Sequence, residues 1–247
     1  MQSVQTVFSL SCCSLPFLKS RYVTDYIYEH PVGNRCAWSL YKVKAVKENN
    51  PKLVLICSPN NPTGQYLDVN DARKIIEATN GLVLLDLAYI DFSDNDYTNI
   101  ALDYDNVISF RTFSKAMSLP SIRCGYAIST SDNIDMINAI KAPYSVTTLS
   151  QIMAKIANDN FDLYKNQIDL IKTERDRLYN ELLKLGFSVY PSKSNFIFLI
   201  MDDKYNDVLI KNKIYIRKFK ENTYRITVGS KEENDKLIEV LKCERQK

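Results

Sequence analysis

The chain has 247 residues, enough to bury the core of one large domain or of two smaller ones. Its 45% hydrophobic and 25% charged residues are typical of a globular protein. The formal charge of +3 is weak and no run of five basic residues occurs, so we expect no nucleic-acid partner. No apolar run approaches the roughly 20 residues of a membrane span, so we expect no membrane partner.

Residue types that are scarce exclude several kinds of active site. His30 is the only histidine, which excludes a histidine-rich metal site, and its neighbours do not favour a catalytic triad. The six cysteines show no C-x-x-C spacing, so we predict no metal site and expect reduced thiols in a cytoplasmic protein. The glycine-rich nucleotide-binding motifs G-x-G-x-x-G and G-x-x-x-x-G-K-[ST] are both absent from the sequence. The chemistry is therefore expected from lysine, carboxylate, tyrosine or a cofactor.

Short apolar runs in the first half of the chain predict buried strands. No basic residue precedes Lys19, so the apolar N-terminus is interpreted as a buried helix or strand and not as a signal peptide. Helix-compatible segments such as 70–79 separate the first three runs, which favours a parallel sheet covered by helices. The predicted strands are Leu53–Cys57, Leu82–Asp86, 107–113 and 124–129.

The second half begins with a long helical stretch from about residue 149. Apolar residues recur on one helical face between positions 168 and 185, and Gly186 supplies a C-terminal stop. A final helix is expected from Ser230, which forms a capping box with Glu233. Short strands are predicted between these helices at 187–190, Phe196–Ile200, 214–216 and 224–228. We therefore predict an α/β fold, with a mostly parallel sheet in a large domain (1–155) and a small C-terminal α+β domain (156–247).

Polar residues follow three of the predicted strands at their carboxyl ends, where open parallel sheets bind ligands. S-P-N-N-P-T-G, which contains Asn61, follows the first strand; Asp86 ends the second, with Tyr89 three residues later. R-T-F-S-K (111–115) follows Val107–Phe110 of the third strand, and Arg123 comes eight residues after its lysine. Each feature has an ordinary explanation by itself: a turn, a helix cap, a solvated loop and a surface charge. Their occurrence at three consecutive strand ends favours a ligand site.

These side chains match the requirements of pyridoxal-phosphate catalysis. Lys115 would form a Schiff base with the cofactor aldehyde, and Asp86 would keep the pyridine nitrogen protonated so that the ring accepts electrons. Tyr89 and Asn61 would hydrogen-bond the ring's phenolate oxygen. The hydroxyls and the guanidinium that suit the cofactor phosphate are those of Thr112, Ser114 and Arg123.

Five motifs occur in one order along the chain: S-P-N-N-P-T-G (58–64), D-L-A-Y-I-D-F (86–92), T-F-S-K-A-M-S-L-P-S-I-R-C-G-Y (112–126), S-N-F-I-F (194–198) and Y-R-I-T-V-G (224–229). With them the sequence resembles the class I/II pyridoxal-phosphate aminotransferases of fold type I, most of all the histidinol-phosphate aminotransferase branch. The resemblance implies that Arg225 binds the substrate's α-carboxylate or an equivalent anion and that Asn195 lines the site. Arg217 either lies near the substrate or is a solvated edge charge. A homodimer is also implied.

The sequence departs from the family pattern in two places. Leu87 replaces the glutamate of the usual D-E-A-Y, and its side chain is expected to point away from the ring. Family members have a longer N-terminal region, with a small-residue loop that binds the cofactor phosphate at a helix N-terminus. The chain is therefore expected to be an N-terminally shortened member, in which Phe17 or Tyr22 would stack on the pyridine ring.

The predicted function is transfer of an amino group between an amino acid or amine, histidinol-phosphate-like, and a 2-oxo acid. Pyridoxal 5'-phosphate would be the cofactor, and Lys115 would also be the general base that moves the substrate's α-proton. Small amino and 2-oxo acids of amino-acid biosynthesis are then the expected partners. Two alternatives stay open: a decarboxylase of a phosphorylated amino acid with the same cofactor, and a truncated, non-catalytic family member.

Overall fold

The computed structural model describes residues 6–8 and 43–246, which fall into two compact units. The first unit comprises the described residues up to Cys57 together with Leu67–Ala88 and Asp96–Phe161, and the second comprises Ser58–Tyr66, Tyr89–Asn95 and the chain from Asp162 onward. Two loops from the first half of the sequence therefore belong to the second unit. The predicted domains 1–155 and 156–247 stay a prediction. The predictions for the N-terminus, including Phe17 and Tyr22, lie outside the described residues.

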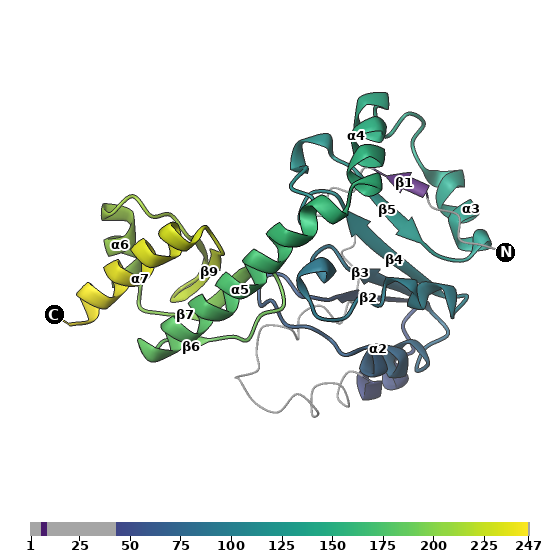
Figure 1. Cartoon of the computed structure of the whole chain (residues 1–247). Helices are drawn as coiled ribbons and strands as arrows, with labels where there is room; N and C mark the ends of the chain where they lie inside the picture. The colour runs from purple at the N-terminus through teal and green to yellow at the C-terminus, as the bar shows by residue number, and fades with distance from the viewer. Residues whose placement is uncertain (1–5, 9–42, 247) are drawn as a thin grey trace. The chain divides into compact units, whose positions relative to one another are not determined.

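Within the described residues, the first unit contains a five-stranded sheet in the order β1-β5-β4-β3-β2 (Figure 1). β2, β3 and β4 are parallel, as predicted, whereas β5 runs antiparallel to β4 and β1 antiparallel to β5. Val83, Leu85 and Val107 are fully buried, as expected for apolar strands covered on both faces. The strands are β1 Thr6–Phe8, β2 Leu53–Cys57, β3 Leu82–Asp86, β4 Val107–Thr112 and β5 Gly125–Ile128.

Local side-chain capping sets the helix ends in the first unit. Asp68 caps α2 by accepting a 2.8 Å hydrogen bond from Asn70 N, so the helix begins one residue before the predicted start. The long helix expected from residue 149 is instead two helices, because Asn160 ends α4 and bonds back to the Ile156 carbonyl. The helices are α2 Val69–Ile76, α3 Ser131–Ile140 and α4 Thr148–Asp159, with 3₁₀ turns η3 Thr98–Leu102 and η4 Pro120–Ile122. In the part of the chain that the structure describes, no helix is long and apolar enough to span a bilayer.

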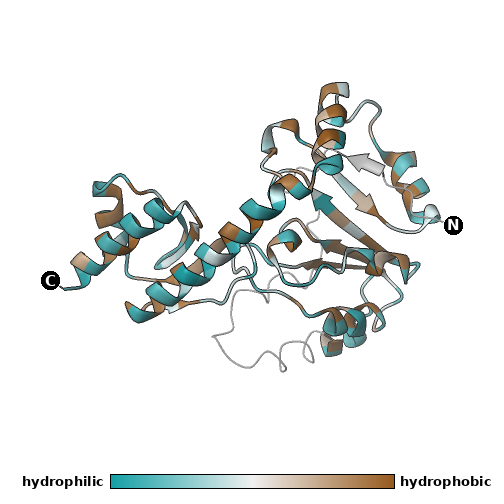
Figure 2. Cartoon of the chain, viewed as in Figure 1, coloured by the Kyte–Doolittle hydropathy of each residue, from teal (hydrophilic) through white to brown (hydrophobic). Residues whose placement is uncertain are grey.

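The second unit packs three helices on an antiparallel sheet of order β6-β7-β9-β8. Its core joins Leu178 and Leu182 of α5 to Ile197 and Leu199 of β7, all fully buried. Figure 2 shows hydrophobic and hydrophilic residues alternating along α5, as its predicted apolar face requires. The elements are α5 Asp162–Lys184, β6 Ser188–Val189, β7 Phe196–Ile200, α6 Asp203–Lys211, β8 Arg217–Lys220, β9 Thr223–Thr227 and α7 Lys231–Arg245, with η2 Ile90–Phe92 in the loop from the first half.

The predicted strand at 214–216 is wrong. Ile214 N donates to the Leu209 carbonyl (2.9 Å) where α6 ends, and β8 starts only at Arg217. Ile214 and Ile216 pack against the core of the second unit, so their alternation reflects burial within a loop and not strand pairing.

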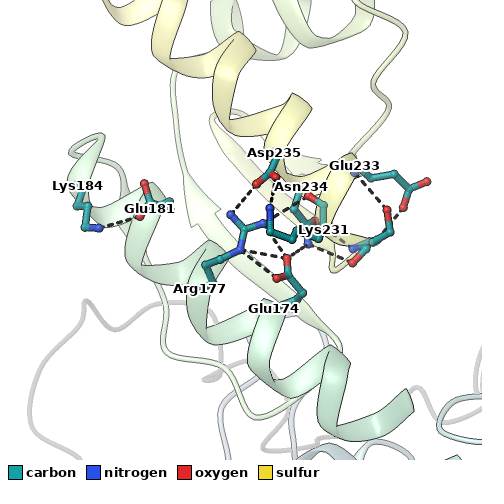
Figure 3. Close-up of polar contacts among 10 residues, drawn as sticks. Glu174, Arg177, Glu181, Lys184, Lys231, Glu233, Asn234 and Asp235 are labelled. Carbon is teal, nitrogen blue, oxygen red and sulfur yellow. Dashed lines mark hydrogen bonds and ion pairs between the residues drawn. The ribbon is translucent and has the colours of Figure 1, made fainter. Parts of the chain in front are cut away.

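Charged residues tie α5 to α7 in the second unit (Figure 3). Arg177 contacts Glu174 and Asp235, each at 2.7 Å, and Asn234 Nδ2 donates to Glu174 Oε2 at 3.0 Å. α7 begins with the predicted capping box between Ser230 and its N3 glutamate. The network fixes the end of β9 because Asn234 also bonds the backbone of Gly229 twice.

Candidate active site

The first unit brings predicted site residues to one edge of its sheet. Asp86 is the last residue of β3 and Thr112 is the last residue of the parallel strand β4. Both therefore lie where the carboxyl ends of the parallel strands meet. The Asp86 carboxylate accepts a 3.1 Å hydrogen bond from Ala88 N, which orients it beyond the strand end. Asp86 is half-buried, so its carboxylate keeps access to a ligand.

The turn after β4 places the lysine and the hydroxyls. Thr112 Oγ1 accepts from Ser114 N (3.1 Å), and the Ser118 N donates to the Lys115 carbonyl (3.1 Å). Arg123 adopts a left-handed backbone (φ +49°), and its guanidinium donates to the Pro120 carbonyl at 2.9 Å. Such a backbone is uncommon for arginine and is found often at ligand sites. Ser114 and Lys115 are half-buried and Arg123 is exposed.

Arg111, between the predicted strand and its lysine, has a structural role. Its buried guanidinium contacts Asp96 Oδ2 (2.8 Å) and Thr98 Oγ1 (2.6 Å), and so joins β4 to η3. Burial acts to raise the pKa of Asp96, but the Arg111 charge and hydrogen bonds from Thr98 outweigh it and hold that pKa below its ordinary value. The guanidinium of Arg111 is engaged by Asp96 and Thr98, so we do not assign Arg111 to ligand binding.

The Asp96–Arg111 pair predicts acid sensitivity. Because the folded-state pKa of Asp96 is lowered, its stabilisation is complete above the unfolded value of about 3.9 and is lost as the pH falls through the folded value. Asp96→Asn should therefore flatten the dependence of the free energy of unfolding on pH below about pH 4, measured by denaturant titration. Asp159→Asn, which removes an exposed i,i+4 pair with Lys155, should leave that slope unchanged. Equal slopes in the wild type and Asp96→Asn would contradict the assignment.

The second unit holds another group of predicted residues around Arg225. Arg225 Nη1 donates a 2.6 Å hydrogen bond to Asn61 Oδ1. Since a guanidinium only donates, the Asn61 amide nitrogen is left to donate in another direction. Arg225 Cζ lies 4.8 Å from the centre of the Phe196 ring and 5.6 Å from that of Phe219, and its buried Nε has no hydrogen-bond partner among the described residues. The guanidinium has further N–H donors besides the one that Asn61 accepts, and these suit an anionic ligand.

Tyr89, Asn195 and Arg217 lie beside this group. The buried Tyr89 ring meets the Phe196 ring edge to face, with centroids 5.1 Å apart. Asn195 directly precedes Phe196, and its carbonyl accepts from Val228 N at 3.0 Å, just beyond β9. Arg217 is exposed on β8 and pairs in register with Arg225 of β9. Two cationic side chains therefore stand side by side on neighbouring strands.

Gly64 closes the turn that carries Asn61, and any side chain there would be strained. Its φ is +72°, and a Cβ at this position would lie 2.1 Å from Ser192 Oγ and 2.7 Å from Ser192 Cβ. The Gly64 carbonyl also accepts from Lys193 N at 2.7 Å. The turn is thereby anchored to the segment that leads into Phe196.

We expect Gly64→Ala to lower the free energy of unfolding by about 1–3 kcal/mol, because the backbone is left-handed and Ser192 must move. Denaturant unfolding measures this loss. Adding Ser192→Gly to Gly64→Ala should recover the loss of stability that the clash causes. The loss caused by the left-handed backbone should remain. A loss below about 0.5 kcal/mol would refute the close approach.

Taken together, the first unit offers an amine, a carboxylate, two hydroxyls and a guanidinium from one sheet edge. The second offers a tyrosine, two asparagines and two arginines, grouped around an aromatic ring. The first set fits a pyridine ring that carries an aldehyde and a phosphate; the second suits a small anionic substrate. Residues that the sequence interpretation left out are Phe196, Ser192 and Arg175, and only the phenylalanine had a signal, in S-N-F-I-F.

Residues 33–241 match the family model described as aminotransferase class I and II. The chain belongs to this family. It is 38% identical over 213 residues to a histidinol-phosphate aminotransferase of Thermoanaerobacter pseudethanolicus, an alignment that covers 81% of this chain and 59% of that protein. This class I and II chain therefore spans about three fifths of the length of the curated relatives it matches.

Solved structures agree with the family assignment. A histidinol-phosphate aminotransferase from Sinorhizobium meliloti, in complex with pyridoxal-5'-phosphate, is 26% identical with a TM-score of 0.71, covering 81% of this chain and 60% of its own. L-threonine-O-3-phosphate decarboxylase from Porphyromonas gingivalis shares the fold at 22% identity and a TM-score of 0.71, covering 80% of this chain and 66% of its own. The predicted family and the fold type I α/β class are confirmed.

Proposed function

We propose that this chain takes part in pyridoxal-phosphate-dependent transfer of an amino group between a small amino acid or amine and a 2-oxo acid. The observation that carries the proposal is the placement of Asp86, Thr112 and Lys115 at and just beyond the carboxyl ends of two adjacent parallel strands. Relatives named histidinol-phosphate aminotransferase support this reaction class and suggest a histidinol-phosphate-like donor. A role in amino-acid biosynthesis is part of the proposal.

The cofactor would be held by side chains of the first unit. Lys115 Nζ would bond its aldehyde carbon, Asp86 would hold the proton of its ring nitrogen, and its phosphate would take hydrogen bonds from Thr112, Ser114 and Arg123. When bound, pyridoxal phosphate supplies an electron sink for the bonds at the substrate's α-carbon. Once the substrate's amino group has displaced Lys115 from the aldehyde carbon, the freed Lys115 Nζ would accept the α-proton and return it to the product.

The remaining candidate residues are proposed to bind the substrate and the ring's phenolate oxygen. Arg225 would bind the α-carboxylate through its guanidinium, and Arg217 and Asn195 would lie along the rest of the substrate. The Asn61 amide nitrogen and the Tyr89 hydroxyl would donate to the ring's phenolate oxygen.

We further propose a homodimer in the cytoplasm. Cys124 and Cys243 form no disulfide with another described residue, which suits a reducing compartment. Light scattering on the purified chain tests the dimer: a single species of monomer mass would contradict it.

The reaction is tested by adding pyridoxal phosphate to the full chain and screening amino donors with 2-oxoglutarate. We expect a visible absorption band, its loss on borohydride treatment, and glutamate formation without carbon dioxide. Carbon dioxide release from a phosphorylated amino acid would instead support the decarboxylase alternative, whose fold the Porphyromonas enzyme shares. No band at saturating cofactor would refute both enzyme functions and leave the non-catalytic alternative.

A further inference from the structure

Arg175 is a fully buried arginine in the middle of α5. It is 1% exposed, although its local sequence, E-R-D-R, is that of a solvated helix face. A guanidinium stays charged at all accessible pH values, so its burial is costly unless its donors are satisfied. A buried arginine at this place therefore needs specific partners.

The partners of Arg175 are main-chain carbonyls from distant parts of the sequence. Its Nη1 donates to the Phe92 carbonyl at 2.8 Å and to the Ser194 carbonyl at 3.4 Å. Among the described residues it forms one ion pair, through Nε to Asp176 at 2.9 Å, and the Asp176 side chain is 64% exposed. The inner side of the guanidinium thus bridges two backbone segments of the second unit.

Both segments carry residues of the candidate site. Phe92 ends η2, the turn that directly follows Tyr89, and Ser194 directly precedes Asn195 and Phe196. The Tyr89 and Phe196 rings are in contact, and Phe196 in turn lies under Arg225.

Other ties between these segments are weaker. Lys172 Nζ reaches the Ser93 carbonyl at 3.3 Å, and Lys193 pairs with Asp94 at 2.6 Å. The Asp94 side chain is 57% exposed, and exposed pairs contribute little. Of these three basic side chains, Arg175 is the one that is buried.

We propose that Arg175 is a positioning residue of the amino-transfer reaction. By bonding the Phe92 and Ser194 carbonyls it fixes the backbone segment after Tyr89 relative to the segment before Phe196. Tyr89 and the Arg225–Asn61 pair are thereby held in one arrangement. The inference rests on the proposed function, and Arg175 itself touches neither cofactor nor substrate. Loss of Arg175 would let the Tyr89 segment shift and weaken its hydrogen bond to the ring's phenolate oxygen.

Arg175→Met keeps the apolar stem of the side chain and removes the donors, and Arg177→Met is the matched control. Arg177 lies on the same helix, but it bonds Glu174 and Asp235 and so joins α5 to α7 (Figure 3). Both variants are expected to be less stable. Only Arg175→Met should raise the pH midpoint of the bound cofactor's visible absorbance, by about one pH unit, because a less satisfied phenolate oxygen holds the shared proton more tightly.

A double-mutant cycle with Tyr89→Phe separates positioning from a general loss of stability. The midpoint shift of Arg175→Met should disappear in the Tyr89→Phe background, and Arg175→Lys should recover part of it. Shifts that add, or a wild-type midpoint in Arg175→Met, would overturn the proposal. If the wild type shows no visible band, the proposed function fails and with it the role in amino transfer.

Hydrogen exchange tests the structural hold without cofactor. Faster exchange at 89–95 and 192–196 in Arg175→Met, but not in Arg177→Met, supports the hold. Unchanged exchange overturns it whatever the cofactor does.

Discussion

Replacing Lys115 by alanine is expected to abolish the visible absorption band that pyridoxal phosphate gives with the wild-type chain. Lys115 follows the end of β4 by three residues and is half-buried beside the Thr112–Ser114 turn. Without its amine no covalent bond to the cofactor can form, and the group that would move the α-proton is lost. Amino transfer should fall by at least about 10²–10⁴-fold, the usual contribution of a general base. Absorbance spectra and single-turnover kinetics measure the two effects separately.

Lys155→Ala is the matched control for this experiment. Lys155 is 76% exposed on α4, in the same unit, and pairs only with Asp159 of its own helix among the contacts seen. It should retain both the band and the rate. A band that persists in Lys115→Ala and disappears in Lys155→Ala would refute the assignment of the cofactor-binding lysine.

The sequence predicted well what local patterns determine. Leu53–Cys57 and Leu82–Asp86 were predicted with the bounds they have, because each apolar run is uninterrupted and stops at a polar residue. The capping box at Ser230 was predicted for the same reason, since both of its partners lie within one helical turn. Local chemistry alone sets these features.

Contacts between distant segments could not be predicted in this way. The turn that carries Asn61 belongs to the second unit, where Gly64 packs against Ser192. These two residues are 128 positions apart in the sequence. Nothing near Gly64 indicates that partner. Arg175 falls at the spacing of the apolar face that contains Leu178, but nothing near it in the sequence indicates the carbonyls of Phe92 and Ser194 that its guanidinium bonds. Candidate site residues could thus be proposed from their chemical type, whereas the residues that hold their segments in place required the tertiary structure.

Arg225→Gln is expected to lower kcat/KM for glutamate and 2-oxoglutarate by about 30-fold to several thousand-fold. That range corresponds to about 2–5 kcal/mol, the cost of removing one partner of a desolvated charge pair. The change should appear mainly in KM for carboxylate substrates, because Arg225 would bind the substrate and not move its proton. Steady-state kinetics over a range of both substrates measures it.

A second effect follows from the 2.6 Å bond between Arg225 and Asn61. Arg225→Gln frees the Asn61 amide to rotate, so we expect the pH midpoint of the cofactor's absorbance to rise in this variant and equally in Asn61→Ala, with no further shift in the double variant. Arg225→Lys should recover little of KM, because an ammonium keeps the charge but cannot offer the planar fork of donors. Lys220→Gln removes the same charge from the adjacent strand β8 and should leave KM unchanged. If Arg225→Gln changes KM for glutamate no more than Lys220→Gln does, Arg225 is not the carboxylate-binding residue, and its contacts with Phe196 and Asn61 serve only the packing of the second unit.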